Sequence, residues 1–255
     1  MAIQSIARAA EILRELERTR GLGLNELCER LGVAKGTTHG LLKALQEEGL
    51  VTQEPVSSRY LLGPALLQLG HSYLEVDDVR ATALGWSDRL ASTAGEGVRV
   101  AVRFRDRALL VHEVAGAEAI EWLEIGAALP LHATALGKCL LAYGDPNGEE
   151  IEAFTPETIV KHAQLEGELA NVLSQSWAVE REEFQVGVAS VAAPVFDGSG
   201  MVAAAVGVRG PVGRILTPRG QPQAGLAMQI CAVARGMSRD LGSRRWPIVP
   251  PRPAV

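Results

Sequence analysis

The stretch from Lys35 to Glu48 holds the residue types and spacing best suited to chemistry in this chain, and that chemistry is contact with a nucleic acid. If the stretch is a helix, Thr38 and three leucines form one stripe that we expect to be buried. The other positions include Lys35, Gly36, Thr37, His39, Gly40 and Lys43. A glycine inside a helix costs about 1 kcal/mol relative to alanine, so exposed glycines one turn apart need a reason. Close approach of the helix backbone to DNA would supply it, with His39 and Lys43 reaching bases or phosphates.

These residues also allow a plainer interpretation, in which one glycine begins the helix, the other is tolerated, and His39 is an ordinary solvated histidine. Ser5 in the N-terminal arm, Arg8 near the first predicted helix and Arg59 near a predicted hairpin would contact phosphates. Simple surface solvation explains those three residues as well. The elements around the stretch decide in favour of DNA binding.

Residue patterns that support catalysis or metal binding are missing. The chain has no G-x-S-x-G, H-E-x-x-H or G-x-x-x-x-G-K-[ST] motif, and its glycines at 207, 210 and 213 lack the dinucleotide-binding spacing. The histidines are scattered, so only a metal site assembled from distant positions would escape notice. Lys138 stands beside Cys139, but nothing nearby activates the thiol, and we interpret Cys139 as a core residue. We therefore predict no catalytic residue, no metal site and no cofactor.

Composition indicates a globular protein of the cytosol. The 255 residues are 47% hydrophobic and 22% charged, and three cysteines without a C-x-x-C pair argue against a disulfide framework. The N-terminus has no apolar signal region, and the longest apolar runs are too short to span a bilayer. The net charge is −5, and residues 1–74 hold eight basic and eight acidic residues. An N-terminal region without net charge attracts DNA only weakly, so a monomer would bind poorly. We therefore expect a homodimer or homotetramer on adjacent half-sites.

The spacing of apolar residues indicates which elements position these residues. It changes from helical to alternating at glycine and proline residues. Residues 1–63 predict three short helices and a hairpin, which together make a winged helix-turn-helix. Residues 64–79 predict a linker helix, and residues 80–243 predict an antiparallel sheet with helices on it. Its strands are expected at 98–104, 108–114, 121–125, 188–196 and 201–208, and its helices at 80–94, 135–143, 165–177 and 222–241. The proline-rich residues 244–255 predict a disordered tail.

The sequence resembles the IclR family of bacterial transcriptional regulators over essentially its whole length. The words QSIARAAEIL, LGVAKGTTHGLLKALQEEGLV and RYLLG are similar to the DNA-binding domain of that family. The words PLHATALGKCLLAY, AVEREEFQVGVASVAAPVFD and AAAVGVRGP are similar to its effector domain, in the same order. The resemblance implies an α+β protein with a winged helix followed by a GAF-like α/β effector-binding and oligomerisation domain. It also implies a dimer or a pair of dimers that binds a palindromic operator and responds to a small molecule.

A narrower resemblance concerns the branch of actinobacterial glycerol operon regulators. AKGTTHGLL, with glycine at Gly40 where much of the family has arginine, looks like that branch, as do LGHSYLEV and SRDLG. The branch implies repression of glycerol uptake and phosphorylation genes, relieved by glycerol or glycerol 3-phosphate. The alternative is an enzyme that processes a small molecule and carries an accessory winged helix. The lack of a nucleophile paired with a base disfavours it.

The family resemblance also implies where an effector binds. By position, the contacts fall on His132, Ala133, Thr134, Ala135, Gly137, Glu180, Ser190, Val202 and Gly207. The residues themselves support part of this set, because a helix beginning after Thr134 offers unpaired amides, and Ser190 offers a hydroxyl within an apolar strand. Plainer roles are open too: His132 bonded to local backbone, Thr134 as a helix cap, and Glu180 within a solvated acidic run.

Overall fold

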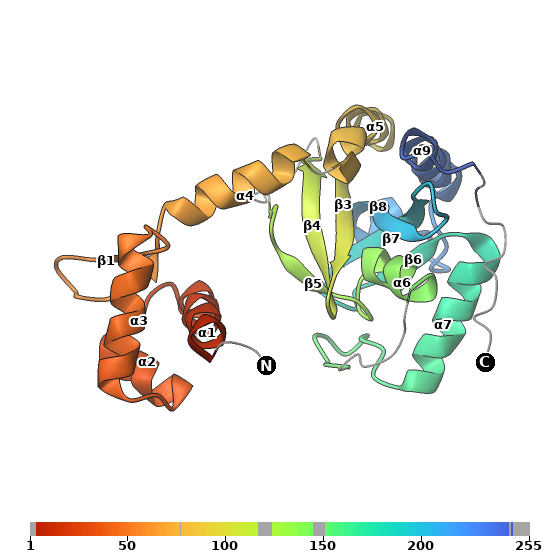
Figure 1. The fold of residues 1–255 in the computed structure, drawn as a ribbon. Coiled ribbons are helices and arrows are strands. Elements are labelled where there is room, and N and C mark those ends of the chain that lie inside the picture. Colours follow the sequence, from red (N-terminus) through yellow and green to blue (C-terminus); the bar gives the residue numbers. More distant parts are fainter. Residues whose placement is uncertain (1–3, 77, 117–123, 145–150, 245, 247–255) are drawn as a thin grey trace. The chain divides into compact units, whose positions relative to one another are not determined.

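The structure is a computed structural model that describes residues 4–76, 78–116, 124–144, 151–244 and 246. The chain divides into two compact units, residues 1–76 and 77–255. Each unit has its own hydrophobic core, and Figure 1 shows their elements. Among the described helices, none is both long and apolar enough to cross a membrane.

The first unit contains the three helices and the hairpin that the sequence predicts. Helices α1 (Gln4–Thr19), α2 (Leu24–Leu31) and α3 (Lys35–Glu47) precede strands β1 (Val51–Gln53) and β2 (Tyr60–Leu62), which pair antiparallel. Helix α4 (Ala65–Val76) follows. One stripe of each of the helices α1, α2 and α3 enters the core, because apolar residues recur at helical spacing. The fully buried core residues are Ile12, Leu16, Leu22, Leu27, Leu42, Leu45, Val51 and Tyr60.

Short turns set how the first three helices meet. Gly32 ends α2 with a φ of 61°, which glycine adopts without the steric strain of a side chain. Gly23 precedes α2, and its backbone N–H donates to Glu26 Oε2 at 2.6 Å. Gly63 lies so close to β1 that a Cβ there would stand 2.1 Å from the carbonyl oxygen of Gly49. These turns hold α3 against α1 and α2 with its outer face in solvent.

The second unit is a six-stranded antiparallel sheet in the order β5-β4-β3-β8-β7-β6. Its strands are β3 (Gly97–Phe104), β4 (Arg107–Val114), β5 (Ala128–Pro130), β6 (Ala178–Arg181), β7 (Val188–Phe196) and β8 (Val202–Pro211). Helices α5 (Asp78–Ala94) and α9 (Leu226–Asp240) pack together on one side of it. Helices α6 (Ala135–Ala142) and α7 (His162–Gln175) pack on the other, and the short α8 (Val212–Ile215) follows β8. The predicted α+β class is thereby confirmed.

Several predicted bounds in the second unit are wrong. The strand expected at 121–125 partly falls outside the described residues, and Glu124 and Ile125 are not in a strand. The chain turns at Gly126, with a φ of 92°, before β5 begins. The closing helix starts at Leu226 rather than at residue 222, because Pro222 bridges to Leu216. Strands β5 and β6 and helix α8, each three or four residues long, were not predicted. Of the tail predicted at 244–255, only residues 244 and 246 are described.

Candidate functional site

Helix α3 exposes the face that the sequence singled out. Lys35, Gly36, Thr37, His39, Gly40 and Lys43 are all solvent-exposed, whereas Thr38 and Leu42 are fully buried. The Thr38 hydroxyl donates to the carbonyl oxygen of Ala34 at 3.3 Å. The helix therefore has the orientation expected from its periodicity, with its polar residues and both glycines turned to solvent.

The two glycines of α3 are not required by the fold of the chain. A Cβ built on Gly36 or on Gly40 meets no atom within 4 Å, and neither glycine has a positive φ. Alanine would fit both positions and would favour the helix. A flat backbone surface is thus present on α3 without an internal packing reason, which is the property expected where a helix lies close to another molecule.

Two cations of the first unit, Lys43 on α3 and Arg59 before β2, lie close to carboxylates. Lys43 Nζ lies 3.9 Å from Glu47 Oε1, and both side chains are largely exposed. The Arg59 guanidinium donates to the carbonyl oxygen of Gly21 at 2.8 Å and lies 3.3 Å from Glu26 Oε2. Arg59 therefore ties the hairpin to the turn between α1 and α2 while its side chain stays 45% exposed. On α1, Ser5 is exposed and Arg8 is half-buried.

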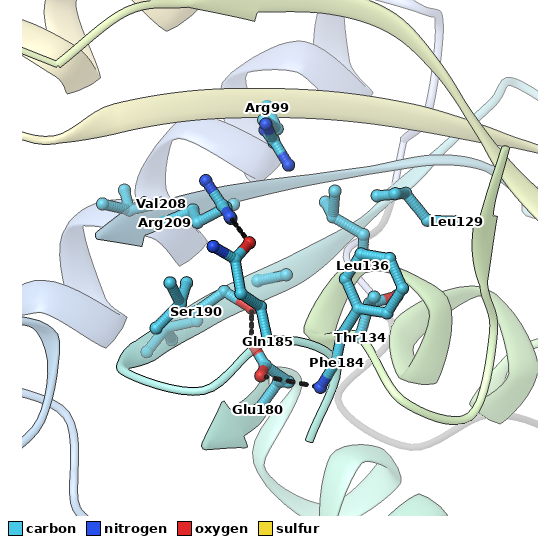
Figure 2. A pocket seen from close by; sticks show the side chains of 14 residues that line it. Arg99, Leu129, Thr134, Leu136, Glu180, Phe184, Gln185, Ser190, Val208 and Arg209 are labelled. Atoms are coloured by element: carbon cyan, nitrogen blue, oxygen red, sulfur yellow. Dashed lines mark hydrogen bonds between the residues drawn. The ribbon is translucent and has the colours of Figure 1, made fainter. Parts of the chain in front are cut away.

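A pocket opens in the second unit between the sheet, the start of α6 and the turn that joins β6 to β7 (Figure 2). Its empty space is about 410 Å³, including the part open to solvent. It is lined by Arg99, Leu129, Thr134, Leu136, Glu180, Phe184, Gln185, Val188, Ser190, Val191, Ala192, Gly207, Val208 and Arg209. An apolar wall with a few polar groups is typical of a small-molecule site.

Thr134 and Gly137 shape the side of the pocket formed by α6. Thr134 caps the helix, because its hydroxyl oxygen accepts the Gly137 N–H at 3.1 Å and its hydroxyl donates to the carbonyl oxygen of Pro130 at 2.7 Å. A Cβ on Gly137 would lie 2.3 Å from the carbonyl oxygen of Leu131, so only glycine fits. On β8, a Cβ on Gly207 would lie 2.7 Å from the carbonyl oxygen of Val191. These close approaches fix the backbone around the pocket.

Glu180 is a buried polar residue of the pocket and is the lowest labelled side chain in Figure 2. Its Oε2 accepts the Ser190 hydroxyl at 2.8 Å, and its Oε1 accepts the N–H groups of Glu183 at 3.0 Å and Phe184 at 3.4 Å. Burial raises the pKa of Glu180 to about 7, opposed by these hydrogen bonds and assisted by the nearby charge of Glu183. This carboxyl group thus changes charge near neutral pH.

Four of the nine predicted effector contacts line this pocket, namely Thr134, Glu180, Ser190 and Gly207. The others are not among the lining residues. His132 is buried with its Nε2 2.8 Å from the carbonyl oxygen of Glu152 and its ring stacked on Phe154. The remaining four have packing positions: Ala133, Ala135 and Gly137 are buried, and Val202 packs against the core under α6.

Sequence reasoning missed the arginines and the turn residues of the pocket. Arg99, in the apolar run Val98–Val102, is 5% exposed, and its guanidinium pairs with Glu113 Oε1 at 2.7 Å and Glu124 Oε2 at 3.0 Å. A charged residue in an otherwise apolar strand was the signal that could have found it. Phe184, Gln185 and Arg209 come from a turn and a neighbouring strand, and no sequence pattern joins them.

Lys138 and Cys139, which are adjacent in the sequence and lie beside the pocket, have structural roles. Cys139 is fully buried, its thiol donates to the carbonyl oxygen of Ala192 at 3.3 Å, and burial raises the pKa of the thiol. Lys138 is 1% exposed, and its Nζ bonds Glu183 Oε1 at 2.6 Å and the carbonyl oxygen of Val179 at 3.0 Å. Within the described ranges, no group of three or more histidines, cysteines and carboxylates could hold a metal ion.

Comparison with known families gives two matches that together span most of the chain. The model of the IclR helix-turn-helix domain matches residues 5–55, and the model named "Bacterial transcriptional regulator IclR C-terminal" matches residues 71–239. The first match contains α3 with its exposed face. The second contains the pocket.

Individual relatives agree with these matches over nearly the whole chain. The glycerol operon regulatory protein of Streptomyces griseus is 45% identical over 96% of this chain and 98% of its own length. The transcriptional repressor AllR of Escherichia coli K12 is 30% identical over 96% of this chain and 92% of its own. An IclR transcriptional regulator from Alicyclobacillus acidocaldarius has a similar crystal structure, with a TM-score of 0.79 and 27% identity, covering 95% of this chain and all of the other.

Proposed function

Because this chain belongs to the IclR family of bacterial transcriptional regulators, we propose that it represses a glycerol operon under the control of glycerol or glycerol 3-phosphate. Its family and its relatives are transcriptional regulators. The chain is accordingly a DNA-binding regulator and not an enzyme. The observation that carries the glycerol assignment is the 45% identity to the Streptomyces griseus glycerol operon regulatory protein along almost the full length of both chains. The 30% identity to a repressor supports repression as the mode of action.

The proposed operator contacts come from the exposed face of α3. The cationic and imidazole side chains of Lys35, His39 and Lys43 would reach phosphates and base edges, while Gly36 and Gly40 let the backbone approach. Thr37 lies on the same exposed side. Ser5, Arg8 and Arg59 would add contacts to the phosphate backbone.

We propose a homodimer or homotetramer, acting in the cytoplasm on a palindromic operator. Helix α4 supports self-association, because Leu67 is 78%, Leu69 61% and Tyr73 51% exposed along its length. Large apolar side chains gathered on one element are typical of a protein interface. The first unit also has no net charge over residues 1–74, so its electrostatic attraction to DNA is weak. Two DNA-binding domains on adjacent half-sites would compensate for this.

The effector would bind in the pocket around Thr134, Glu180 and Ser190, where hydroxyl and carboxyl groups meet an apolar wall. A small polyol suits these groups, because each of its hydroxyls can both donate and accept. The pocket belongs to the second unit alone, and the operator-binding helix belongs to the first. Control of one by the other is then an allosteric coupling, measured as a ratio of operator affinities with and without effector.

The test is operator binding by the full-length protein. Fluorescence anisotropy with the upstream intergenic DNA of its own gene, at fixed salt, is expected to show specific binding in the nanomolar range. Glycerol or glycerol 3-phosphate should weaken it, with xylitol as a matched polyol control. Specific binding that neither glycerol compound changes would refute the glycerol assignment and keep the regulator.

A further inference from the structure

Two polar side chains of the pocket form a matched pair across neighbouring strands. Glu180 on β6 stands directly opposite Ser190 on β7 in the antiparallel register, so their side chains share one face of the sheet. Figure 2 shows the hydrogen bond between them, 2.8 Å from Ser190 Oγ to Glu180 Oε2. Glu180 is 3% exposed and Ser190 is half-buried, so Ser190 is the member of the pair nearer to solvent.

The hydrogen bonds of Glu180 leave one of its oxygens to carry a proton. Oε1 accepts two backbone N–H groups, and it can do so whether the carboxyl group is charged or neutral. Within the part of the chain that the structure describes, the hydrogen-bond partner of Oε2 is the Ser190 hydroxyl, and a hydroxyl can donate or accept. The pair therefore has two complete arrangements that differ by one proton.

We propose that Glu180 and Ser190 form a proton-controlled switch that decides whether the pocket offers its ligand a hydrogen-bond acceptor or a donor. This inference rests on the proposed function, in that it takes this pocket as the effector site. When Glu180 is ionised, Ser190 donates to Oε2 and turns its lone pairs to the ligand. When Oε2 takes a proton from solvent, it donates to Ser190 Oγ, and the serine hydrogen turns to the ligand.

The two arrangements select different ligands. A neutral polyol can bond either form, but it bonds the ionised form more strongly, because the charge on Glu180 makes the Ser190 oxygen a better acceptor. The same charge repels an anion. The protonated form donates to a phosphate or carboxylate oxygen and carries no negative charge, so an anionic ligand should bind together with a proton. The same pocket would then respond to a polyol and to its phosphate ester with opposite dependence on pH.

The charges around Glu180 are arranged so that both forms exist near neutral pH. Lys138 on α6 is committed to Glu183 at 2.6 Å and lies 3.9 Å from Glu168 on α7, so its charge is balanced there. Arg99 on β3 already pairs with Glu113 and Glu124. Arg209 on β8 is also in the lining, where it donates to Gln185. Arg181 and Glu182, next to Glu180 along the chain, are less buried. The pKa of about 7 for Glu180 agrees with this environment.

The first test observes the proton itself in the ligand-free, full-length protein. Infrared difference spectra of the carboxylic-acid C=O stretch, recorded about one pH unit on either side of 7, should show one buried acid titrating. Glu180→Gln should remove that signal, and Glu166→Gln should keep it, because Glu166 is an exposed carboxylate on α7. If no signal depends on Glu180 in this range, the proposal is wrong, whatever the ligand is.

The second test measures ligand affinity by titration calorimetry with glycerol and glycerol 3-phosphate. From one pH unit below 7 to one unit above, glycerol should bind up to about tenfold more tightly and the phosphate ester correspondingly less tightly. Glu180→Gln cannot titrate, so its glycerol affinity should be flat, and any pH dependence left for the ester belongs to its own phosphate. Equal pH dependence in the wild type and Glu180→Gln would overturn the proposal.

Ser190→Ala keeps the test decisive if Glu180→Gln does not fold. The Ser190 hydroxyl stabilises the ionised carboxyl group, so its loss should raise the pKa of Glu180 and move the infrared titration to higher pH. An unmoved titration in this variant would contradict the switch. Absence of specific operator binding, or binding of neither compound, would instead refute the proposed function, while the infrared titration still decides the proton switch.

Discussion

Replacing Gly40 with alanine should stabilise this protein and at the same time weaken its binding to DNA. Gly40 lies on α3, is exposed, and has open space where a Cβ would go. Alanine lowers the cost of helix formation by about 1 kcal/mol at such a position. For a unit the size of residues 1–76, that corresponds to a rise in the melting temperature of about 4 to 8 °C.

The same methyl group should obstruct a DNA surface that lies against α3. We expect the affinity for the operator to fall by about 1 to 3 kcal/mol, the scale of one lost base contact, which is roughly fivefold to somewhat over a hundredfold. Thermal denaturation monitored by circular dichroism measures the first effect, and fluorescence anisotropy at fixed salt measures the second. Opposite signs in the two assays separate a functional glycine from a structural one.

Gly167→Ala is the matched control, because Gly167 is a helical, exposed glycine of α7 with equally open space around it. It should stabilise the second unit and leave operator affinity unchanged. If Gly40→Ala binds the operator as the wild type does, α3 does not approach DNA at this position, and the reasoning from its exposed glycines fails. If Gly40→Ala lowers the melting temperature, the helix needs this glycine for an internal reason.

Four further substitutions test the exposed face of α3, the role of Arg59 and the pH dependence of stability. His39→Ala and Lys43→Ala should each weaken operator binding by anisotropy without changing the melting curve, since both side chains are exposed; wild-type affinity in both would contradict the orientation of α3. Arg59→Ala should weaken binding on every sequence alike and reduce the salt slope by about 0.9 per lost phosphate contact; a loss confined to one operator base would contradict that role. Burial, and secondarily the charge of Arg80, lowers the pKa of His112 below its usual value. The unfolded chain therefore binds more protons, so stability should fall as pH drops through about 6.5, and His112→Gln should flatten this dependence in denaturant melts.

The orientation of α3 could be predicted from sequence because it depends on local spacing alone. Thr38 and Leu42 recur at helical intervals and are buried. The hairpin could also be predicted locally, because turn residues lie between β1 and β2. The buried Thr38 is informative, since a polar residue on the apolar stripe was assigned to the core from its angle on the helix. The helical repeat of 3.6 residues per turn was sufficient to predict which side chains of α3 are buried.

The pocket could not be predicted in the same way, because its polar contacts join distant segments. Arg209 reaches Gln185 across 24 positions, and the direct facing of Glu180 and Ser190 depends on the register of β6, a strand of four residues. Glu180 was predicted from family resemblance, with a solvated surface role as the alternative. Its burial of all but 3% excludes the solvated role, while its contact with an effector stays a prediction, and no composition or period in the sequence carries the information on burial.

The charge pattern of the first unit indicates that DNA binding depends on fit more than on charge. Exposed ion pairs stabilise a protein by about 0 to 1 kcal/mol each, so phosphates can displace them at little cost. Among the described residues, such pairs include Arg18–Glu15, Arg30–Glu15, Lys43–Glu47 and Arg59–Glu26. Each phosphate contact made by one of these cations leaves a carboxylate near the DNA, and this partly cancels the electrostatic gain. In the proposed dimer, specificity would then come from the close backbone approach that Gly36 and Gly40 permit, and affinity from the simultaneous binding of two DNA-binding domains.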